Sequence, residues 1–161
     1  MKKTLIISLI ALFLAPLSMA CYNVYYTADS DEHMHEVDRL HFEGKLNKNF
    51  NAELIVNKMS KMEEELKVSG DYKMLNDYAI FMVKLGKNEE ALEILIALNQ
   101  KYPDEYTIAA NLGTTYELAG EVDSALKYIN RGMELNPDSH GGSEWVHIKV
   151  LETKLELAKD S

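Results

Sequence analysis

The sequence repeats at a spacing of 34 residues. Glycine, alanine and proline recur at this spacing in four pairs: Ala79 and Gly113, Gly86 and Gly120, Ala91 and Ala125, and Pro103 and Pro137. A fixed period of this length indicates copies of one supersecondary unit that stack on one another. We therefore expect two consecutive units, at residues 72–105 and 106–139. An ordinary helical bundle with accidental spacing is the alternative interpretation.

Each recurring residue has a physical role in a pair of antiparallel helices. Gly86 and Gly120 allow the positive φ with which a helix often ends, and Pro103 and Pro137 stop the second helix of each unit. Small residues let the two helices of a unit cross closely, because a large side chain there would overpack the contact. The second helix of each unit has an apolar stripe at three- and four-residue steps. These stripes are Ala91, Leu92, Leu95 and Leu98, and Ala125, Leu126, Ile129 and Met133.

The second unit resembles a tetratricopeptide repeat. The signature places of that family are occupied by Leu112, Gly113, Tyr116, Gly120, Ala125, Ile129 and Pro137. The resemblance implies an all-α fold, a short α-solenoid of helix hairpins in which a helix A is followed by a helix B. Two such units do not cover their own apolar faces, since about three are needed for stability. We therefore expect flanking helices.

Two amphipathic segments can supply this cover. Residues 49–69 are predicted to form a flanking helix that packs on the first unit. Residues 143–159 are predicted to form a C-terminal capping helix, with Ser143 as its N-cap. His147 stands at the place of the small residue, so we expect no complete third unit.

The first twenty residues have the pattern of an export signal. Lys2 and Lys3 precede an apolar stretch from Leu5 to Leu17, and small residues stand before the expected cleavage point. Residues 1–20 are therefore predicted to be a signal peptide. A retained membrane anchor is the alternative, but the apolar stretch is short for a membrane span.

Cys21, the one cysteine of the chain, directly follows this signal. Residues 17–21 resemble the lipobox of bacterial lipoproteins, although Ser18 stands where an aliphatic residue is usual. The resemblance implies that Cys21 carries a lipid, which would anchor the protein without a transmembrane helix. Ordinary cleavage would instead release a soluble periplasmic protein. Either outcome places the protein in a bacterial cell envelope, in the periplasm or at the outer membrane.

Residues 21–48 differ in character from the rest of the chain. Val24 to Thr27 and Met34 to Val37 contain strand-forming residues on either side of a turn-rich sequence, which predicts a small β-hairpin. A disordered tether is an equal alternative. Asp31, His33 and His35 are weak candidates for metal ligands, because alternate residues project from one face of a strand. No metal site or cofactor is predicted.

Composition and motifs argue against other function classes. A net charge of -9 repels nucleic acid and anionic lipid surfaces. A single cysteine excludes an internal disulfide framework and paired-cysteine zinc sites. His35 and Glu36 begin like a zinc-protease helix, but Arg39 stands where the second histidine is required. We predict no catalytic residues and a protein that is not an enzyme.

The resemblance also implies a partner-binding groove. Tetratricopeptide repeats hold an extended peptide or a partner helix on the inner face of the A helices, and the expected function is therefore that of an adaptor for another protein. Asn111 matches one asparagine of the family's carboxylate clamp, but Ile80 replaces the other, so we expect no such clamp. A metal or small-ligand carrier based on the N-terminal histidines is the alternative. The predicted groove residues are Lys73, Asn76, Ile80, Val83, Lys84, Thr107, Ala110, Thr114, Glu117, Leu118, Glu144, Ile148 and Leu151.

Overall fold

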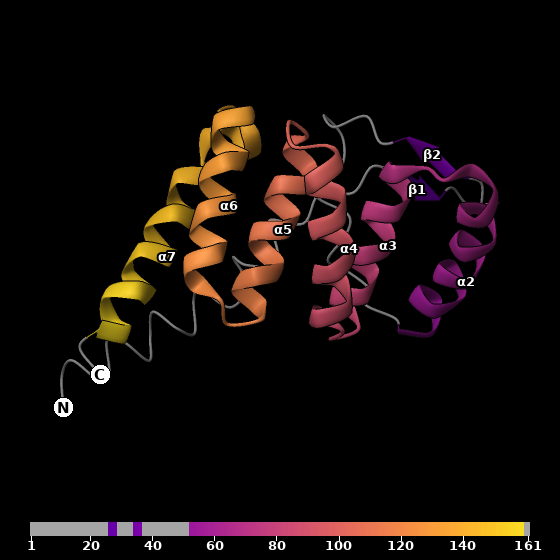
Figure 1. The fold of residues 1–161 in the computed structure, drawn as a ribbon, viewed down its shortest axis with the longest axis horizontal. Helices are drawn as coiled ribbons and strands as arrows, with labels where there is room; N and C mark the ends of the chain where they lie inside the picture. The colour runs from indigo at the N-terminus through magenta and orange to yellow at the C-terminus, as the bar shows by residue number, and fades with distance from the viewer. Residues whose placement is uncertain (1–25, 29–33, 37–51, 160–161) are drawn as a thin grey trace.

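The computed structural model describes residues 26–28, 34–36 and 52–159, and residues 52–159 form a row of antiparallel helices (Figure 1). Each α-helix packs on the next one along the chain, which confirms the predicted all-α solenoid of helix hairpins with flanking helices. The helices are α2 (Ala52–Ser69), α3 (Tyr72–Lys84), α4 (Asn88–Lys101), α5 (Tyr106–Leu118), α6 (Val122–Leu135) and α7 (Glu144–Lys159), with a short 3-10 helix η3 (Ser139–Gly142) before α7.

The two hairpin turns have the same structure. Gly86 has a φ of +78° and Gly120 a φ of +85°, as expected for glycines that end a helix. The Gly86 amide donates to the carbonyl of Val83 at 2.9 Å, and the Gly120 amide donates to that of Glu117 at 3.0 Å. One residue further on, Lys87 and Glu121 donate to carbonyls that are also 34 residues apart, those of Met82 and Tyr116. The sequence period is therefore a period in backbone hydrogen bonding.

Small residues lie where the helices of each hairpin cross. Ala79 of α3 and Ala91 of α4 are both fully buried in one hydrophobic cluster. In the second hairpin, a Cβ at Gly113 would lie 2.8 Å from the side chain of Ile129. The closest approach at Gly113 therefore involves Ile129, one helical turn beyond Ala125, which was the expected neighbour. Only a residue without a side chain fits this crossing.

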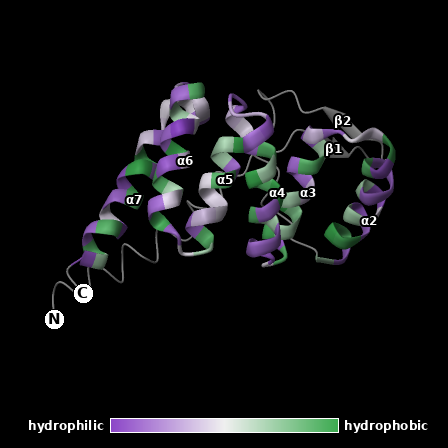
Figure 2. Cartoon of the chain, viewed as in Figure 1, coloured by the Kyte–Doolittle hydropathy of each residue, from purple (hydrophilic) through white to green (hydrophobic). Residues whose placement is uncertain are grey.

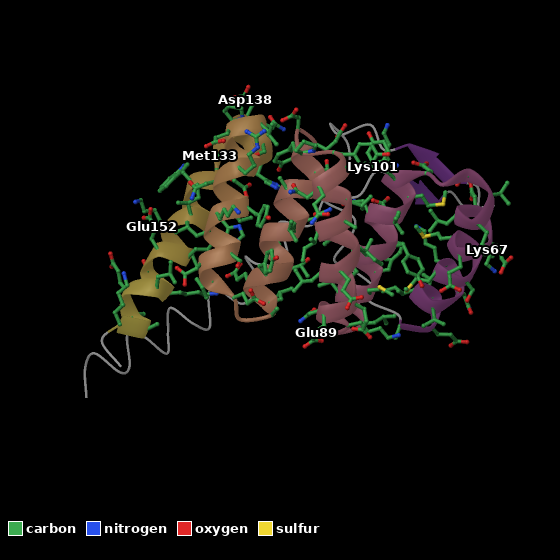
Figure 3. The ribbon with its side chains drawn as sticks, in the orientation of Figure 1. Lys67, Glu89, Lys101, Met133, Asp138 and Glu152 are labelled. Carbon is green, nitrogen blue, oxygen red and sulfur yellow. The ribbon has the colours of Figure 1, made fainter. Side chains whose placement is uncertain are left out.

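The flanking helices complete the core at the two ends. Between α2 and α3, Met59, Met62, Met74 and Phe81 form a hydrophobic cluster, where Figure 3 shows the sulfur atoms gathered. Helix α7 buries Ile148 and Leu151 against Ala125 and Ile129 of α6. Hydrophilic and apolar residues alternate around the helices, as Figure 2 shows. Helices α2 and α7 therefore cover apolar surface that the two repeats alone would expose to water.

The start of α7 differs in detail from the expected N-cap. The Ser143 hydroxyl donates to the carbonyl of His140 at 2.7 Å. His140 has a φ of +50°, and Gly141 and Gly142 also have positive φ, so the chain reverses within η3. This tight reversal brings the carbonyl of His140 within reach of the serine.

Two short strands pair in the N-terminal region. Strand β1 (Tyr26–Ala28) and strand β2 (Met34–Glu36) are antiparallel, with Thr27 opposite His35, as in the predicted β-hairpin. Strand β1 lies next to α3. No helix in the described part of the chain is long and apolar enough to cross a membrane. The predicted signal peptide and Cys21 lie outside the described residues.

Candidate partner-binding face

The predicted groove residues come from the first helix of each hairpin and from α7. Lys73 and Lys84 are half-buried, and Leu118 is 43% exposed. The others are buried: Asn76, Ile80, Val83, Thr107, Ala110, Thr114, Glu117, Glu144, Ile148 and Leu151. We refer to all of these residues together with Asn111 as the A-helix face. That they contact a partner stays a prediction.

The apolar members of the A-helix face pack within the protein. Ile80 and Val83 belong to the hydrophobic cluster between α3, α4 and α5. Ala110 lies against Gly132 of α6, where a Cβ on the glycine would be 3.6 Å away. Ile148 and Leu151 pack against α6. These five side chains stabilise the fold. The members of the A-helix face that are not buried are Lys73, Lys84 and Leu118.

A chain of hydrogen bonds links the polar side chains of α5 and α3. The Asn111 side-chain amide donates to Asn76 Oδ1 at 3.0 Å, and Asn76 Nδ2 donates to Asp77 Oδ1 at 3.0 Å. All three side chains are buried. Because a buried amide left without a partner is costly, this chain fixes the relative position of the two helices. Asn111 matches one asparagine of the family's clamp, although no clamp was expected here, and in the structure it bonds to Asn76.

Charged side chains join α5 to α7 at the other end of the face. Glu117 accepts a hydrogen bond from Lys154 at 2.5 Å and is 2.6 Å from His147 Nε2. The other ring nitrogen of His147 lies 3.7 Å from Glu144, which is also 3.5 Å from His140 Nε2. Burial by itself would raise the pKa of Glu117, but the hydrogen bonds and positive charges of His147 and Lys154 lower it below its ordinary value. Glu117 is thus held as a carboxylate.

Sequence reasoning predicted Glu117 and Glu144 but not the partners of Glu117. His147 was noted only as a residue too large for the small-residue place, and Lys154 was not singled out. One signal was available for His147: it stands at a place where the repeat requires a small side chain. Lys58 of α2, which lies near Lys84 over the ring of Phe81, was also missed because it precedes the first repeat.

The N-terminal candidates are only partly described. His35 is in strand β2, while Asp31, His33 and Cys21 lie outside the described residues. Within the described ranges, no group of three or more His, Cys, Asp or Glu residues is placed to hold a metal ion. No structural observation therefore favours the metal-carrier alternative.

Comparison with known proteins agrees with the geometry. A tetratricopeptide repeat family model matches residues 82–142, from the last turns of α3 through η3. The match and the stacked hairpins support a tetratricopeptide repeat protein. None of the curated proteins that were compared with the chain matches it.

Tetratricopeptide repeats form extended binding surfaces from stacked helix pairs. The repeats of this chain therefore support a general role as an adaptor between proteins. Residues 82–142 include Thr107, Asn111, Thr114 and Leu118, which recur at four-, three- and four-residue steps and so lie along one side of α5. The matched segment thus contains these four residues of the A-helix face.

Proposed function

We propose that this protein is a non-catalytic adaptor of the bacterial cell envelope that holds a peptide or a partner protein along the A-helix face. The observation that carries the proposal is the pair of stacked tetratricopeptide hairpins, in which α5 ends at the side chain of Leu118, an apolar residue that is 43% exposed. Binding sites for peptides combine apolar contacts with a few placed hydrogen-bonding groups, and Leu118 supplies an exposed apolar contact at the end of α5.

The partner test places a photo-crosslinking amino acid at single positions in the intact producing cell. Leu118 is the test position because its side chain is 43% exposed at the end of α5. Gln100 of α4 is the control position, since it is exposed and lies on the second helix of its hairpin. We expect a discrete crosslinked protein from position 118 and none from position 100. Equal products from both positions, or none from position 118, would contradict binding at this face.

We further propose that the chain is exported and that Cys21 carries a lipid. The supporting observations are the basic and apolar pattern of residues 1–20 and the position of Cys21 directly after it. Labelling the producing cell with a fatty-acid analogue should yield a labelled protein, and Cys21→Ala should abolish the label. Label that persists in the variant would rule out this lipidation site. A protein that is exported but never labelled would indicate a soluble periplasmic adaptor.

A further inference from the structure

Two lysines approach the same aromatic ring near the start of the A-helix face. The Nζ of Lys58, on α2, lies 5.0 Å from the centroid of the Phe81 ring, and the Nζ of Lys84, in the last turn of α3, lies 5.6 Å from it. Both distances are within the range of a cation–π interaction. Both lysines are half-buried, whereas lysine side chains usually extend into water.

Among the described residues, two lysines and one aspartate act on one another electrostatically near this ring. Burial is the main cause that lowers the pKa of both lysines, and the charge of Lys58 lowers the pKa of Lys84 further. The negative charge of Asp77 acts in the opposite direction and by itself would raise the pKa of both lysines. Asp77 Oδ1 also accepts the hydrogen bond from Asn76 Nδ2, so this carboxylate does not serve the two lysines alone.

We propose that Lys58 and Lys84 together bind a carboxylate side chain of the partner protein. A carboxylate has two oxygens and can accept one charge-assisted hydrogen bond from each ammonium group. The inference rests on the proposed adaptor function, because it specifies one contact that a partner would make at the A-helix face. The preferred partner segment is therefore acidic, with an Asp or Glu side chain placed over Phe81.

The local charge favours a carboxylate over a phosphate. Within the part of the chain that the structure describes, two lysines less the charge of Asp77 leave about one positive charge, which a single carboxylate neutralises. A phosphate monoester carries about -1.5 to -2 at neutral pH and would face Asp77 with an excess of negative charge. The net charge of -9 on the whole chain does not prevent the contact, because charges more than about 8 Å away are screened at physiological ionic strength.

The test measures binding of labelled model peptides to the purified chain by fluorescence anisotropy. The probes are hexaglutamate, hexaglutamine and a hexapeptide of phosphoserine. We expect hexaglutamate to bind the most tightly of the three, and to bind more weakly as salt increases. Lys58→Gln and Lys84→Gln should each weaken hexaglutamate binding about tenfold, which corresponds to about 1.4 kcal/mol.

Lys127→Gln is the matched control. Lys127 also lies over an aromatic ring, with its Nζ 5.1 Å from the ring of Tyr128, but it is exposed on α6. This variant should bind hexaglutamate as the parent does. Circular dichroism should give the same helix content for the parent and for all three variants, and Lys84→Arg, which keeps the charge, should retain most of the binding.

Three results of the peptide assay would overturn the inference. Hexaglutamate could bind no more tightly than hexaglutamine, the phosphoserine peptide could bind more tightly than hexaglutamate, or Lys127→Gln could weaken binding as much as the other two variants. The proposed adaptor function is tested separately by the crosslink at Leu118. A crosslinked partner that is captured equally by the parent, Lys58→Gln and Lys84→Gln would leave the adaptor function standing and remove only the carboxylate contact. Binding of hexaglutamate without any crosslink from position 118 would instead contradict binding along the face.

Discussion

The backbone of Gly113 lies against Ile129 so closely that a Cβ would be 2.8 Å from two side-chain carbons and 2.9 Å from the backbone nitrogen of the isoleucine. The side chain of Ile129 could rotate away, but the backbone nitrogen could not move without shifting α6. We therefore expect Gly113→Ala to lower the free energy of unfolding by about 1–3 kcal/mol, as for other overpacked contacts. Urea unfolding followed by circular dichroism measures this change.

Gly132→Ala is the matched control for that variant. Gly132 is also a helical glycine on the contact between α5 and α6, but a Cβ there would meet Ala110 at an ordinary 3.6 Å. Alanine is favoured over glycine inside a helix by about 0.5–1 kcal/mol. The control should therefore be neutral or stabilising. A similar loss of stability in both variants would show that steric contact at Gly113 is not the cause.

Gly120→Ala should destabilise the second hairpin turn without any steric clash. No atom lies within 4 Å of a Cβ built at Gly120, yet its φ is +85°. A residue with a Cβ in the left-handed region costs about 1–2 kcal/mol. Gly86→Ala should cost the same, because Gly86 has the corresponding conformation. Thermal unfolding of the two single variants and the double variant should give additive losses, and an unchanged midpoint in either single variant would contradict the assigned role of φ.

Asn111→Ala should destabilise the contact between α3 and α5. The change removes the donor to Asn76 Oδ1, and a buried polar group that loses its partner costs about 1–3 kcal/mol. Asn76→Ala removes the other partner of the same bond. If the bond is responsible, the double variant should lose less stability than the sum of the two single losses in urea unfolding. Strict additivity would mean that the two amides act independently.

Glu117 should make the folded state lose stability in acid. Its pKa is lowered in the folded protein, since the hydrogen bonds and charges of His147 and Lys154 outweigh the effect of burial. Its stabilising contribution is therefore present above the ordinary glutamate pKa of about 4.3 and is lost as the pH falls through the lower folded value. Between pH 5 and pH 3, the parent should lose more unfolding free energy than Glu117→Gln.

Glu152→Gln provides the control for the acid experiment. Glu152 pairs with Lys149 at 2.5 Å within α7, but the two side chains are 40% and 67% exposed. Exposed pairs of this kind contribute little to stability. Glu152→Gln should therefore follow the pH dependence of the parent. If Glu117→Gln also follows the parent, the cluster of charges between α5 and α7 does not account for acid sensitivity.

The sequence was sufficient to predict the hairpins because their turns depend on local chemistry. Gly86 and Gly120 end helices through their own backbone conformation. The apolar residues that follow them recur at helical spacing and so lie on the buried side of the next helix. The neighbour of Gly113 was less predictable, because the choice between Ala125 and Ile129 depends on how far one helix slides along the other. A repeat period fixes which residues correspond but does not fix this offset.

The candidate site was predicted less completely than the fold. The resemblance to tetratricopeptide repeats identified α3 and α5 as helices that carry the A-helix face. It did not indicate which side chains of this face are buried in the core. Ile80 and Ala110 contribute to packing within the chain, whereas Asn111 and Glu117 pair with residues of neighbouring helices. Such pairs join residues more than 29 positions apart, as with Glu117 and His147, and no local pattern reveals them.

The turns at Gly86 and Gly120 each form their backbone hydrogen bonds within their own hairpin, so neither turn depends on the other hairpin. A duplicate of residues 106–139 inserted after residue 139 should therefore add one more module and leave the turns of the original two hairpins unchanged. The length of such a molecule is set by the number of modules, and a longer version would gain helical surface without redesign of any single turn.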